Sequence, residues 1–497
     1  MKNRKIILIM TDSQRWDFVN CYRETGLKTP NIDRIAEEGV RFEYAYTTQP
    51  VCQAARSAIF TGQYPHTNGC WTNCAGKAET SYSIGQRLQK EGVHTAYIGK
   101  WHLDGGDYFG MGVCPDGWDE AYWYDMRCYL EELTEEERLL VRNQHNMKTH
   151  DFTADDTFGH RCSNRAIDFL EKYHDEDFFL TVSYDEPHGP FICPPPYPTM
   201  YEGYSFPVSE NVYDTMEGKP DYQRAWARYH VHKPEDNIRL ENPYFFGCNS
   251  FIDEEIGRVV DAAKKYAPDA LIIYTSDHGD MLESHNLWAK GPAAYDEITR
   301  IPFLMMGGGL PKGKVDPLPV SHINLTPTIL DLMGAEIPGT IEGRSLVPQL
   351  ESDVRVNDYV FIEFGRYETD HDGFGGYQPM RAAFDGRYKM SINLLSTDEL
   401  YDTENDPEEL VNLIDNPAYA EIRDRMHDAI LDEMYRTRDP FRGYYWARRP
   451  WRKDAPEATW DDRLMTRQRV ESEAFEKPQL DYSTGLPMNG ATRVKEK

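Results

Sequence analysis

The stretch LIIYTSDHGDML, residues 271–282, decides the fold that we predict for this chain. Its first half, Leu271–Thr275, is a short apolar run, which predicts a strand buried on both faces. Asp277 and His278 follow directly, so a carboxylate and an imidazole are expected where this strand ends. Buried strands of this kind that alternate with helices build a mostly parallel sheet.

Similar apolar runs recur along the chain and alternate with helix-like segments. The other predicted strands are Ile6–Met10, Thr95–Ile98, Phe178–Tyr184 and Phe303–Met306. The predicted helices are Asn31–Glu38, Ser83–Glu91, Ala166–His174, Ile252–Tyr266 and Thr326–Leu332. This alternation predicts an α/β fold in which helices sandwich a large, mostly parallel sheet. In such folds the loops beyond the carboxyl ends of the strands build the active site.

The pattern changes near residue 356, where short alternating runs predict a small antiparallel sheet plus a helix. We therefore divide the chain into a body (1–355), a C-terminal α+β subdomain (356–440) and a tail (441–497) that packs on the body or on a neighbouring subunit of a homo-oligomer. Insertions near 105–155 and 193–247 are rich in Trp, Tyr and Pro. They predict ordered loops over a site, and solvent-exposed loops without a role in a site are the alternative.

The composition limits the partners of this protein. Asp and Glu outnumber Lys and Arg by 83 to 54, and the formal net charge of −29 argues against nucleic acid or an anionic membrane as a general partner. The run Ile6–Met10 is too short for the apolar core of a signal peptide, and nothing resembles a membrane span, so we expect a cytoplasmic protein. The nine cysteines are scattered and do not form a disulfide framework.

Carboxylates follow two of the predicted strands. Asp12 and Ser13 follow the first strand, and Asp277 and His278 follow the strand 271–275. An aspartate after a strand is often only a helix cap, but two at one sheet edge make a Ca²⁺ or Mg²⁺ site reasonable. His278 suits a borderline metal better than Ca²⁺.

Cations and imidazoles lie at the same predicted edge. They are Arg56, Lys100, His102, His188 and Lys290. Each alone could be a surface lysine or a hydrogen-bonded histidine. Together, in so acidic a chain, they predict a pocket that binds a tetrahedral oxyanion and stabilises charge during its transfer.

At this point the chain resembles the sulfatase family, within the alkaline-phosphatase-like superfamily. The segment CQAAR (52–56) fits the family sequence C-x-[P/A]-x-R, and TGQYPHTNG, GKWH, PHGP and SDHGD follow in the family's order. The resemblance covers residues 4–415, including ELYDTENDPEELVNL (399–413). It implies that a maturation enzyme oxidises Cys52 to formylglycine, whereas an inert buried thiol is the alternative.

The resemblance also implies roles for the other residues. Asp12, Asp277, His278 and the modified residue 52 would hold the cation, usually Ca²⁺, with Mg²⁺ or Mn²⁺ as alternatives. Arg56 would orient the aldehyde hydrate, Lys100 and Lys290 would bind sulfate oxygens, and His102 would assist collapse of the intermediate. His188 is the candidate general acid for the leaving alcohol, with Lys290 as its competitor.

Ser13 departs from the family, because many sulfatases have a second acidic residue directly after the first. A neutral hydroxyl there weakens cation binding or leaves a ligand position to water. Phosphonate and phosphodiester hydrolases of the superfamily also have a non-acidic residue at this place.

The leading hypothesis is a sulfuric-ester hydrolase acting on a small organic sulfate, such as a sulfated sugar or an aryl or steroid sulfate. The second is a phosphonate monoester or phosphodiester hydrolase with the same nucleophile, and the third is an inactive carbohydrate-binding relative. In the segment 364–381, we name five residues as candidates for substrate specificity: Arg366, Tyr367, His371, Asp372 and Arg381.

Overall fold

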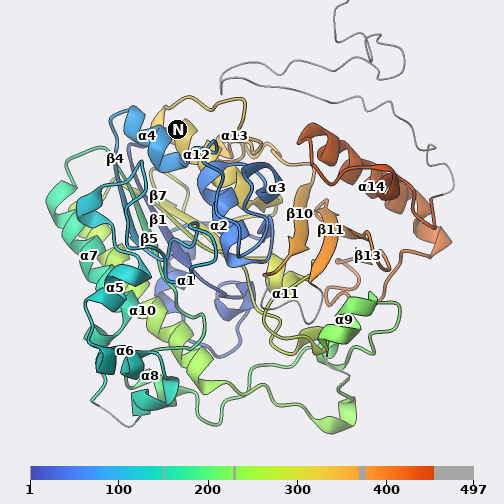
Figure 1. The fold of residues 1–497 in the computed structure, drawn as a ribbon, viewed down its shortest axis with the longest axis horizontal. Coiled ribbons are helices and arrows are strands. Elements are labelled where there is room, and N and C mark those ends of the chain that lie inside the picture. The colour runs from blue at the N-terminus through green and yellow to red at the C-terminus, as the bar shows by residue number, and fades with distance from the viewer. Residues whose placement is uncertain (1, 149–150, 228–230, 369–375, 453–497) are drawn as a thin grey trace, which may run out of the picture.

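A seven-stranded sheet forms the centre of the protein in a computed structural model that describes residues 2–148, 151–227, 231–368 and 376–452 (Figure 1). The strands lie in the order β4-β5-β1-β6-β7-β2-β8. Their bounds are β1 (Lys5–Thr11), β2 (Gly39–Phe42), β4 (His94–Gly99), β5 (Phe178–Ser183), β6 (Leu271–Ser276), β7 (Phe303–Gly307) and β8 (Lys314–Asp316). A short ladder of β3 (Ala45–Tyr46) and β9 (Val320–Ser321) lies apart from this sheet.

The sheet is mostly parallel, as the sequence predicts. The strands β4, β5, β1 and β6 are neighbours and all run parallel, so their carboxyl ends lie at one edge. Strand β7 runs antiparallel to β6 and to β2, because the chain returns alongside β6 after a loop. The sheet is therefore mixed only at β7.

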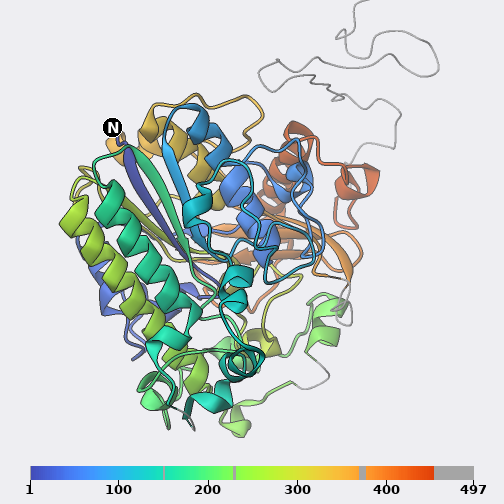
Figure 2. The same ribbon diagram turned by 60° about the vertical axis from the view of Figure 1, so that its left-hand side comes forward.

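Alternating side chains of β1 anchor the two faces of the sheet. Ile7 and Ile9 pack with α1 (Pro30–Glu37), α7 (Phe158–Tyr173) and α10 (Pro243–Tyr266). Ile6, Leu8 and Met10 pack with α2 (Cys52–Thr61), α4 (Ile84–Lys90) and α12 (Leu325–Met333). All five side chains are fully buried, which explains why the strand is a continuous apolar run. Figure 2 shows the long helices α7 and α10 side by side across one face.

The helices of this part of the chain have the following bounds: α1 (Pro30–Glu37), α2 (Cys52–Thr61), α3 (Pro65–Asn68), α4 (Ile84–Lys90), α5 (Met126–Glu131), α6 (Glu135–Val141), α7 (Phe158–Tyr173), α8 (Tyr197–Met200), α9 (Asp221–Trp226), α10 (Pro243–Tyr266), α11 (Asp296–Thr299), α12 (Leu325–Met333) and α13 (Val347–Ser352).

All five predicted strands and all five predicted helices are present, but two helices begin earlier than predicted. Helix α7 begins at Phe158 rather than Ala166, after Thr157, whose side chain accepts a hydrogen bond from the His160 amide. Helix α10 begins at Pro243 rather than Ile252, after the cap Asn242. Each start is marked by a capping residue and by aromatic residues in the first turn, and the apolar periodicity begins only later.

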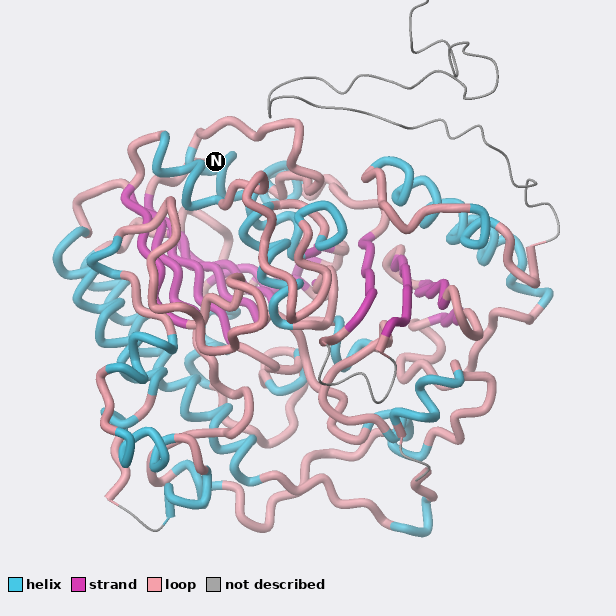
Figure 3. The backbone as a smooth tube through the Cα atoms, viewed as in Figure 1, coloured by secondary structure: helices cyan, strands magenta, loops and turns pink. Residues whose placement is uncertain are grey.

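A smaller antiparallel sheet follows near the C-terminus, as predicted. It contains β10 (Val360–Arg366), β11 (Tyr377–Phe384), β12 (Tyr388–Asn393) and β13 (Glu399–Asp402), and Figure 3 shows it apart from the large sheet. Helix α14 (Ala420–Arg436) packs on it through Met426, Ile430 and Met434.

The first part of the predicted tail packs on this subdomain. It includes the short helix α15 (Tyr444–Ala447), whose Trp446 is buried in the same hydrophobic cluster. Residues 453–497 lie outside the described residues. In the part of the chain that the structure describes, no helix combines the length and apolar character needed to cross a bilayer.

Candidate active site

The side chains of the candidate site gather where four parallel strands end. Asp12 follows β1, Lys100 follows β4, Asp185 follows Ser183 and Tyr184 at the end of β5, and Asp277 follows β6. The strand registers place Met10 opposite Ser183 and Thr11 opposite Ser276, so these ends are level. The fold thus brings together residues far apart in the sequence, as the predicted sheet edge requires.

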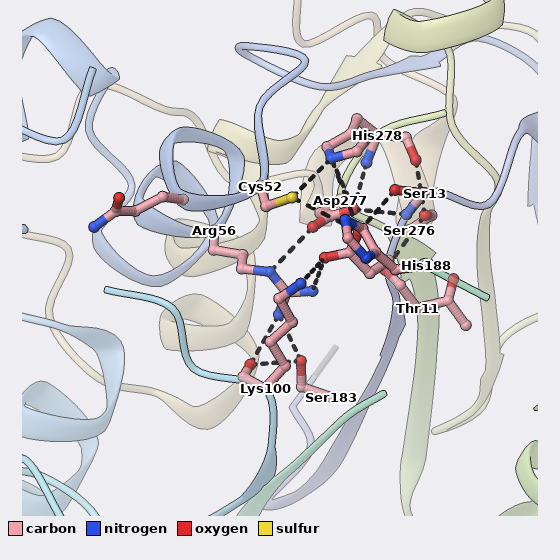
Figure 4. A network of polar contacts seen from close by, with 12 residues as sticks. Thr11, Ser13, Cys52, Arg56, Lys100, Ser183, His188, Ser276, Asp277 and His278 are labelled. Atoms are coloured by element: carbon pink, nitrogen blue, oxygen red, sulfur yellow. Dashed lines mark hydrogen bonds and ion pairs between the residues drawn. The ribbon is translucent and has the colours of Figure 1, made fainter. Parts of the chain in front are cut away.

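Arg56 links the two carboxylates of the predicted metal site (Figure 4). From helix α2 its Nη2 donates to Asp12 Oδ2 at 3.1 Å and its Nε donates to Asp277 Oδ2 at 3.0 Å. Its Nη1 donates to Ser183 Oγ at 2.7 Å and to the Lys100 carbonyl at 2.9 Å. Burial disfavours the charge on Arg56, but Asp277 and Asp12 outweigh it and raise the pKa of the guanidinium. Arg56 therefore holds both carboxylates in place.

The pKa values of the two carboxylates are shifted in opposite directions. Burial opposes the ionisation of Asp12, but the charges of Lys100 and other nearby cations outweigh it and hold the pKa of Asp12 well below its usual range. Burial and the negative charge of Asp12 raise the pKa of Asp277. A bound divalent cation would favour the ionised form of both groups.

Cys52 is the first residue of α2 and faces the same cluster. Its Sγ lies 3.2 Å from His278 Nε2, and Lys290 Nζ donates to it at 2.6 Å. His278 Nδ1 donates to the Gly279 carbonyl at 2.8 Å, which leaves Nε2 as the acceptor that faces Cys52. Gly279 is required next to it, because a Cβ there would lie 1.9 Å from the Glu297 carbonyl oxygen.

These residues fit a divalent cation. The ligand atoms of Asp12, Cys52, Asp277 and His278 all lie within 4.8 Å of one another, and all four residues are buried. Burial and the charge of Lys290 lower the pKa of His278 against the pull of Asp277, so its imidazole is neutral, as a metal ligand must be. Two carboxylates and one imidazole form a suitable donor set for Ca²⁺, Mg²⁺ or Mn²⁺.

Ser13 supports the carboxylates. Its Oγ donates to Asp12 Oδ1 at 2.8 Å, and its amide donates to Asp277 Oδ1 at 3.1 Å. The backbone of Ser13 is left-handed, with φ of 64°. The residue that departs from the family pattern is therefore built into the site.

Lys100 and His102 lie together on the strand β4 side. Lys100 Nζ is 2.8 Å from Asp12 Oδ2 and 2.9 Å from Asp185 Oδ1. Burial opposes the charge on Lys100, but these two carboxylates outweigh it and raise its pKa. Burial and the charge of Lys100 hold the pKa of His102 well below its usual range, so its imidazole is neutral. Its buried Nδ1 has no hydrogen-bond partner among the described residues, so it is free to bind a ligand or water.

His188 lies in the loop after β5, and its Nδ1 is 2.8 Å from the Gly189 carbonyl oxygen and 3.0 Å from Tyr108 Oη. Tyr108 comes from the insertion that follows β4 and also donates to Asp185 Oδ1 at 2.5 Å. Figure 4 shows His188 among the same side chains as Asp277 and Lys100. His188 is thus half-buried at the site, and its role as the general acid stays a prediction.

The candidates for substrate specificity fall in different places. Burial raises the pKa of Tyr367 to about 12. Its carbonyl accepts a hydrogen bond from the Asn73 amide at 2.9 Å, and the Asn73 side chain accepts one from the Gln53 amide, next to Cys52, at 3.1 Å. Thr72 Oγ1 donates to the Tyr367 carbonyl at 2.7 Å. Arg366 is the last residue of β10. His371 and Asp372 lie outside the described residues.

Arg381 belongs to a second buried group of charges, where the C-terminal subdomain meets α3. Its Nε donates to Asp439 at 2.6 Å and lies 4.0 Å from Glu363, and His66 Nδ1 contacts Glu363. His66, Glu363 and Asp439 could by distance hold a metal. Burial alone would lower the pKa of His66, but Glu363 and Asp439 raise it and favour the protonated imidazole, which cannot bind a metal. We therefore interpret this group as a structural ion cluster.

The cluster makes a pH dependence of stability testable. Burial alone would lower the pKa of His66, but Glu363 and Asp439 outweigh it and raise that pKa. The stabilisation by charged His66 is therefore complete below its unfolded pKa of about 6.5 and is lost as the pH rises through the higher folded value. We expect urea unfolding between pH 6 and 9 to show this loss in the wild type and a smaller loss in His66→Gln. Equal pH profiles for the two proteins would contradict the assignment.

Two residues of the site were not predicted from the sequence. Asp185 follows a strand in the same way as Asp12 and Asp277, so the same signal could have found it. Tyr108 lies in an insertion without periodicity, and nothing in its local sequence distinguishes it from neighbouring aromatic residues.

Family models match most of the chain. The model described as Sulfatase matches residues 4–335, and the one described as N-sulphoglucosamine sulphohydrolase, C-terminal, matches residues 284–436. YidJ of Escherichia coli, described as an uncharacterized sulfatase, is 43% identical over 505 residues, which cover 100% of this chain and 99% of the relative. The choline-sulfatase of Rhizobium meliloti is 28% identical over 445 residues, 83% of this chain and 82% of the relative.

Solved structures share the fold. A protein in complex with its substrate D-glucosamine-2-N,6-O-disulfate has a TM-score of 0.72 and 22% identity, over 88% of this chain and 99% of that chain. The phosphonate monoester hydrolase of Silicibacter pomeroyi has a TM-score of 0.69 and 22% identity, over 88% and 96% of the two chains. The family match over residues 4–335 covers more than half of the chain, and the protein therefore belongs to the sulfatase family.

Proposed function

We propose that this protein hydrolyses small organic sulfate esters to inorganic sulfate, with a formylglycine hydrate at residue 52 as the nucleophile and a bound divalent cation. The position of Cys52 carries the proposal. Its Sγ, which stands where the hydrate oxygens would be, is in contact with His278 and Lys290 and lies 3.7 Å from Asp12 Oδ1. A sulfated sugar or a sulfated alcohol such as choline sulfate is the substrate class that the relatives suggest.

The hydrate explains how the ester on the enzyme is released. One hydroxyl gives its proton to the neighbouring Asp12 carboxylate and attacks sulfur. The bond from sulfur to the leaving oxygen breaks, while His188 donates a proton to that oxygen. The second hydroxyl then loses its proton to neutral His102, the bond between the hydrate carbon and the sulfate oxygen breaks, and an aldehyde forms. Water adds to the aldehyde and restores the hydrate. Lys100 and Lys290 hold the sulfate oxygens throughout.

Asp12, Asp277, His278 and residue 52 would hold the cation, for which we propose Ca²⁺. When bound, it supplies Lewis-acid polarisation of a sulfate oxygen and of the nucleophile. A maturation enzyme must supply the formylglycine, so activity requires a host that contains one.

Ser13 gives a direct test of the cation site. We expect Ser13→Asp to raise Ca²⁺ affinity at least about tenfold, because hard cations bind more tightly as carboxylates are added. The same change should destabilise the protein in chelator, since it places a third negative charge beside Asp12 and Asp277. Isothermal titration calorimetry measures the affinity, with Ser13→Ala as the matched control. An unchanged affinity in Ser13→Asp would contradict the cation site.

The general acid is tested with a series of aryl sulfates. We expect His188→Gln to lower kcat about 10²-fold to 10⁴-fold for poor leaving groups and little for nitrophenyl sulfate, which needs no proton. Steady-state kinetics across the series measures how steeply kcat depends on the pKa of the leaving group. Equal slowing for all leaving groups would assign the acid to Lys290 or give His188 a binding role.

Hydrolysis of phosphonate monoesters or phosphodiesters is the second candidate, and the neutral Ser13 beside Asp12 favours it. With one fewer negative charge, the site opposes a charged phosphoryl group less strongly. The ratio of kcat/KM for an aryl sulfate to that for the matching aryl phosphonate decides between the two activities. A ratio below one would replace the sulfatase assignment.

A further inference from the structure

The ring of Tyr108 packs against Lys100, His102 and His188 of the candidate site. Its ring centroid lies 4.1 Å from Lys100 Nζ, 5.6 Å from the ring of His102 and 5.4 Å from the ring of His188. It is half-buried and comes from the insertion between β4 and α5. Through Tyr108, the insertion therefore forms part of the candidate site.

The hydroxyl of Tyr108 fixes the hydrogen-bond pattern of His188. Tyr108 Oη donates its one hydrogen to Asp185 Oδ1 at 2.5 Å, and Lys100 Nζ donates to the same oxygen at 2.9 Å. Toward His188 Nδ1, at 3.0 Å, the hydroxyl can therefore only accept. The Gly189 carbonyl, at 2.8 Å from Nδ1, is also only an acceptor. Both partners thus require hydrogen on Nδ1, and Nε2 is left for the substrate.

The loop around Tyr108 is itself held in place. Asp107 Oδ1 accepts a hydrogen bond from the Phe109 amide at 3.0 Å, and Arg127 Nη2 pairs with Asp107 Oδ2 at 2.7 Å. The ring of Phe109 packs on Tyr108 at 5.3 Å, and Arg142 lies over Phe109 at 5.2 Å. A side chain on such a supported loop can orient a neighbour accurately.

We propose that Tyr108 is a positioning residue, whose hydroxyl links Asp185 to His188 and turns Nε2 of that histidine toward the leaving-group oxygen. The inference rests on the proposed function, in which His188 donates a proton. It differs from a packing role for Tyr108, because phenylalanine would keep the ring over Lys100 and lose only the hydroxyl that bonds Asp185 and His188.

A double-mutant cycle tests the proposal on matured enzyme with aryl sulfates of different leaving groups. We expect Tyr108→Phe to lower kcat tenfold or more for poor leaving groups, with little change in KM and little loss on nitrophenyl sulfate. In the His188→Gln background, Tyr108→Phe should cause no further loss, because it acts through His188. Tyr122→Phe is the matched control: Tyr122 is in the same insertion and donates to Asp168 at 2.8 Å, and its loss should leave the slope unchanged.

Equal slowing for all leaving groups, or an additive loss in the His188→Gln background, would overturn the proposal. A measurement without turnover separates this inference from the proposed function. With ¹⁵N-labelled histidine, and His188 signals assigned from their loss in His188→Gln, we expect a proton on Nδ1 in the wild type and a shifted Nδ1 resonance in Tyr108→Phe. An unshifted resonance would overturn the positioning role, even if no sulfate ester were hydrolysed.

Discussion

Cys52→Ala is expected to lower kcat for any sulfate ester on the order of 10⁵-fold, because the hydrate derived from this residue is the only proposed nucleophile. The change is small in volume at a residue that is 1% exposed, so the fold should survive. Steady-state kinetics on matured protein measures the loss. A variant that retains turnover would show that the nucleophile lies elsewhere.

A second buried thiol provides the matched control. Cys70 is fully buried, and its Sγ donates to the carbonyl of Gln53 at 3.5 Å. Gln53 follows Cys52 in α2. Cys70→Ala should keep turnover within a fewfold of the wild type. The pair also tests the hypothesis of an inactive carbohydrate-binding relative, which predicts ligand binding without turnover even in the wild type.

Arg56→Ala is expected to destabilise the protein by about 3–5 kcal/mol, because it leaves Asp12 and Asp277 without their shared cation in a fully buried place. Urea unfolding in chelator measures this loss. Added Ca²⁺ should restore part of the stability, since it would replace the missing positive charge at the same carboxylates.

An exposed ion pair provides the contrast for this prediction. Arg224 pairs with Asp221 at the surface, with side chains 53% and 83% exposed. Arg224→Ala should cost less than about 1 kcal/mol. Equal effects of the two substitutions would contradict the view that Arg56 neutralises the carboxylates.

The apolar runs of the strands, and the polar residues directly after them, made much of the site predictable. Asp12, Lys100 and Asp277 each follow a buried strand, and parallel strands place their ends at one edge, so the cluster could be inferred without tertiary information. Cys52 needed the family resemblance to be identified as the nucleophile precursor, because a helix of buried residues has no such signal. The predicted fold agrees with the observed fold because both follow from buried apolar strands that alternate with helices.

Tertiary contacts decided what the sequence could not. Arg381 was a candidate for substrate specificity, but its ion-pair partners Asp439 and Glu363 belong to the buried ion cluster that includes His66. Its role in specificity stays a prediction. Tyr108 reaches the site only through the path of its insertion, which no local pattern encodes.

The C-terminal motif shows how a family signature can be structural. Glu409, from ELYDTENDPEELVNL, accepts a hydrogen bond from the Asp296 amide at 2.9 Å and pairs with Lys389 at 2.9 Å. Lys389 also contacts Asp296. The motif thereby joins the smaller sheet to α11, directly after the loop that carries Lys290.

Peptide mass spectrometry across residue 52, on protein produced with a maturation enzyme and active on a sulfate ester, tests the central claim most directly. The account predicts a peptide in which the CH₂–SH group of Cys52 has become an aldehyde or its hydrate. An unmodified thiol at residue 52 in fully active protein would contradict it.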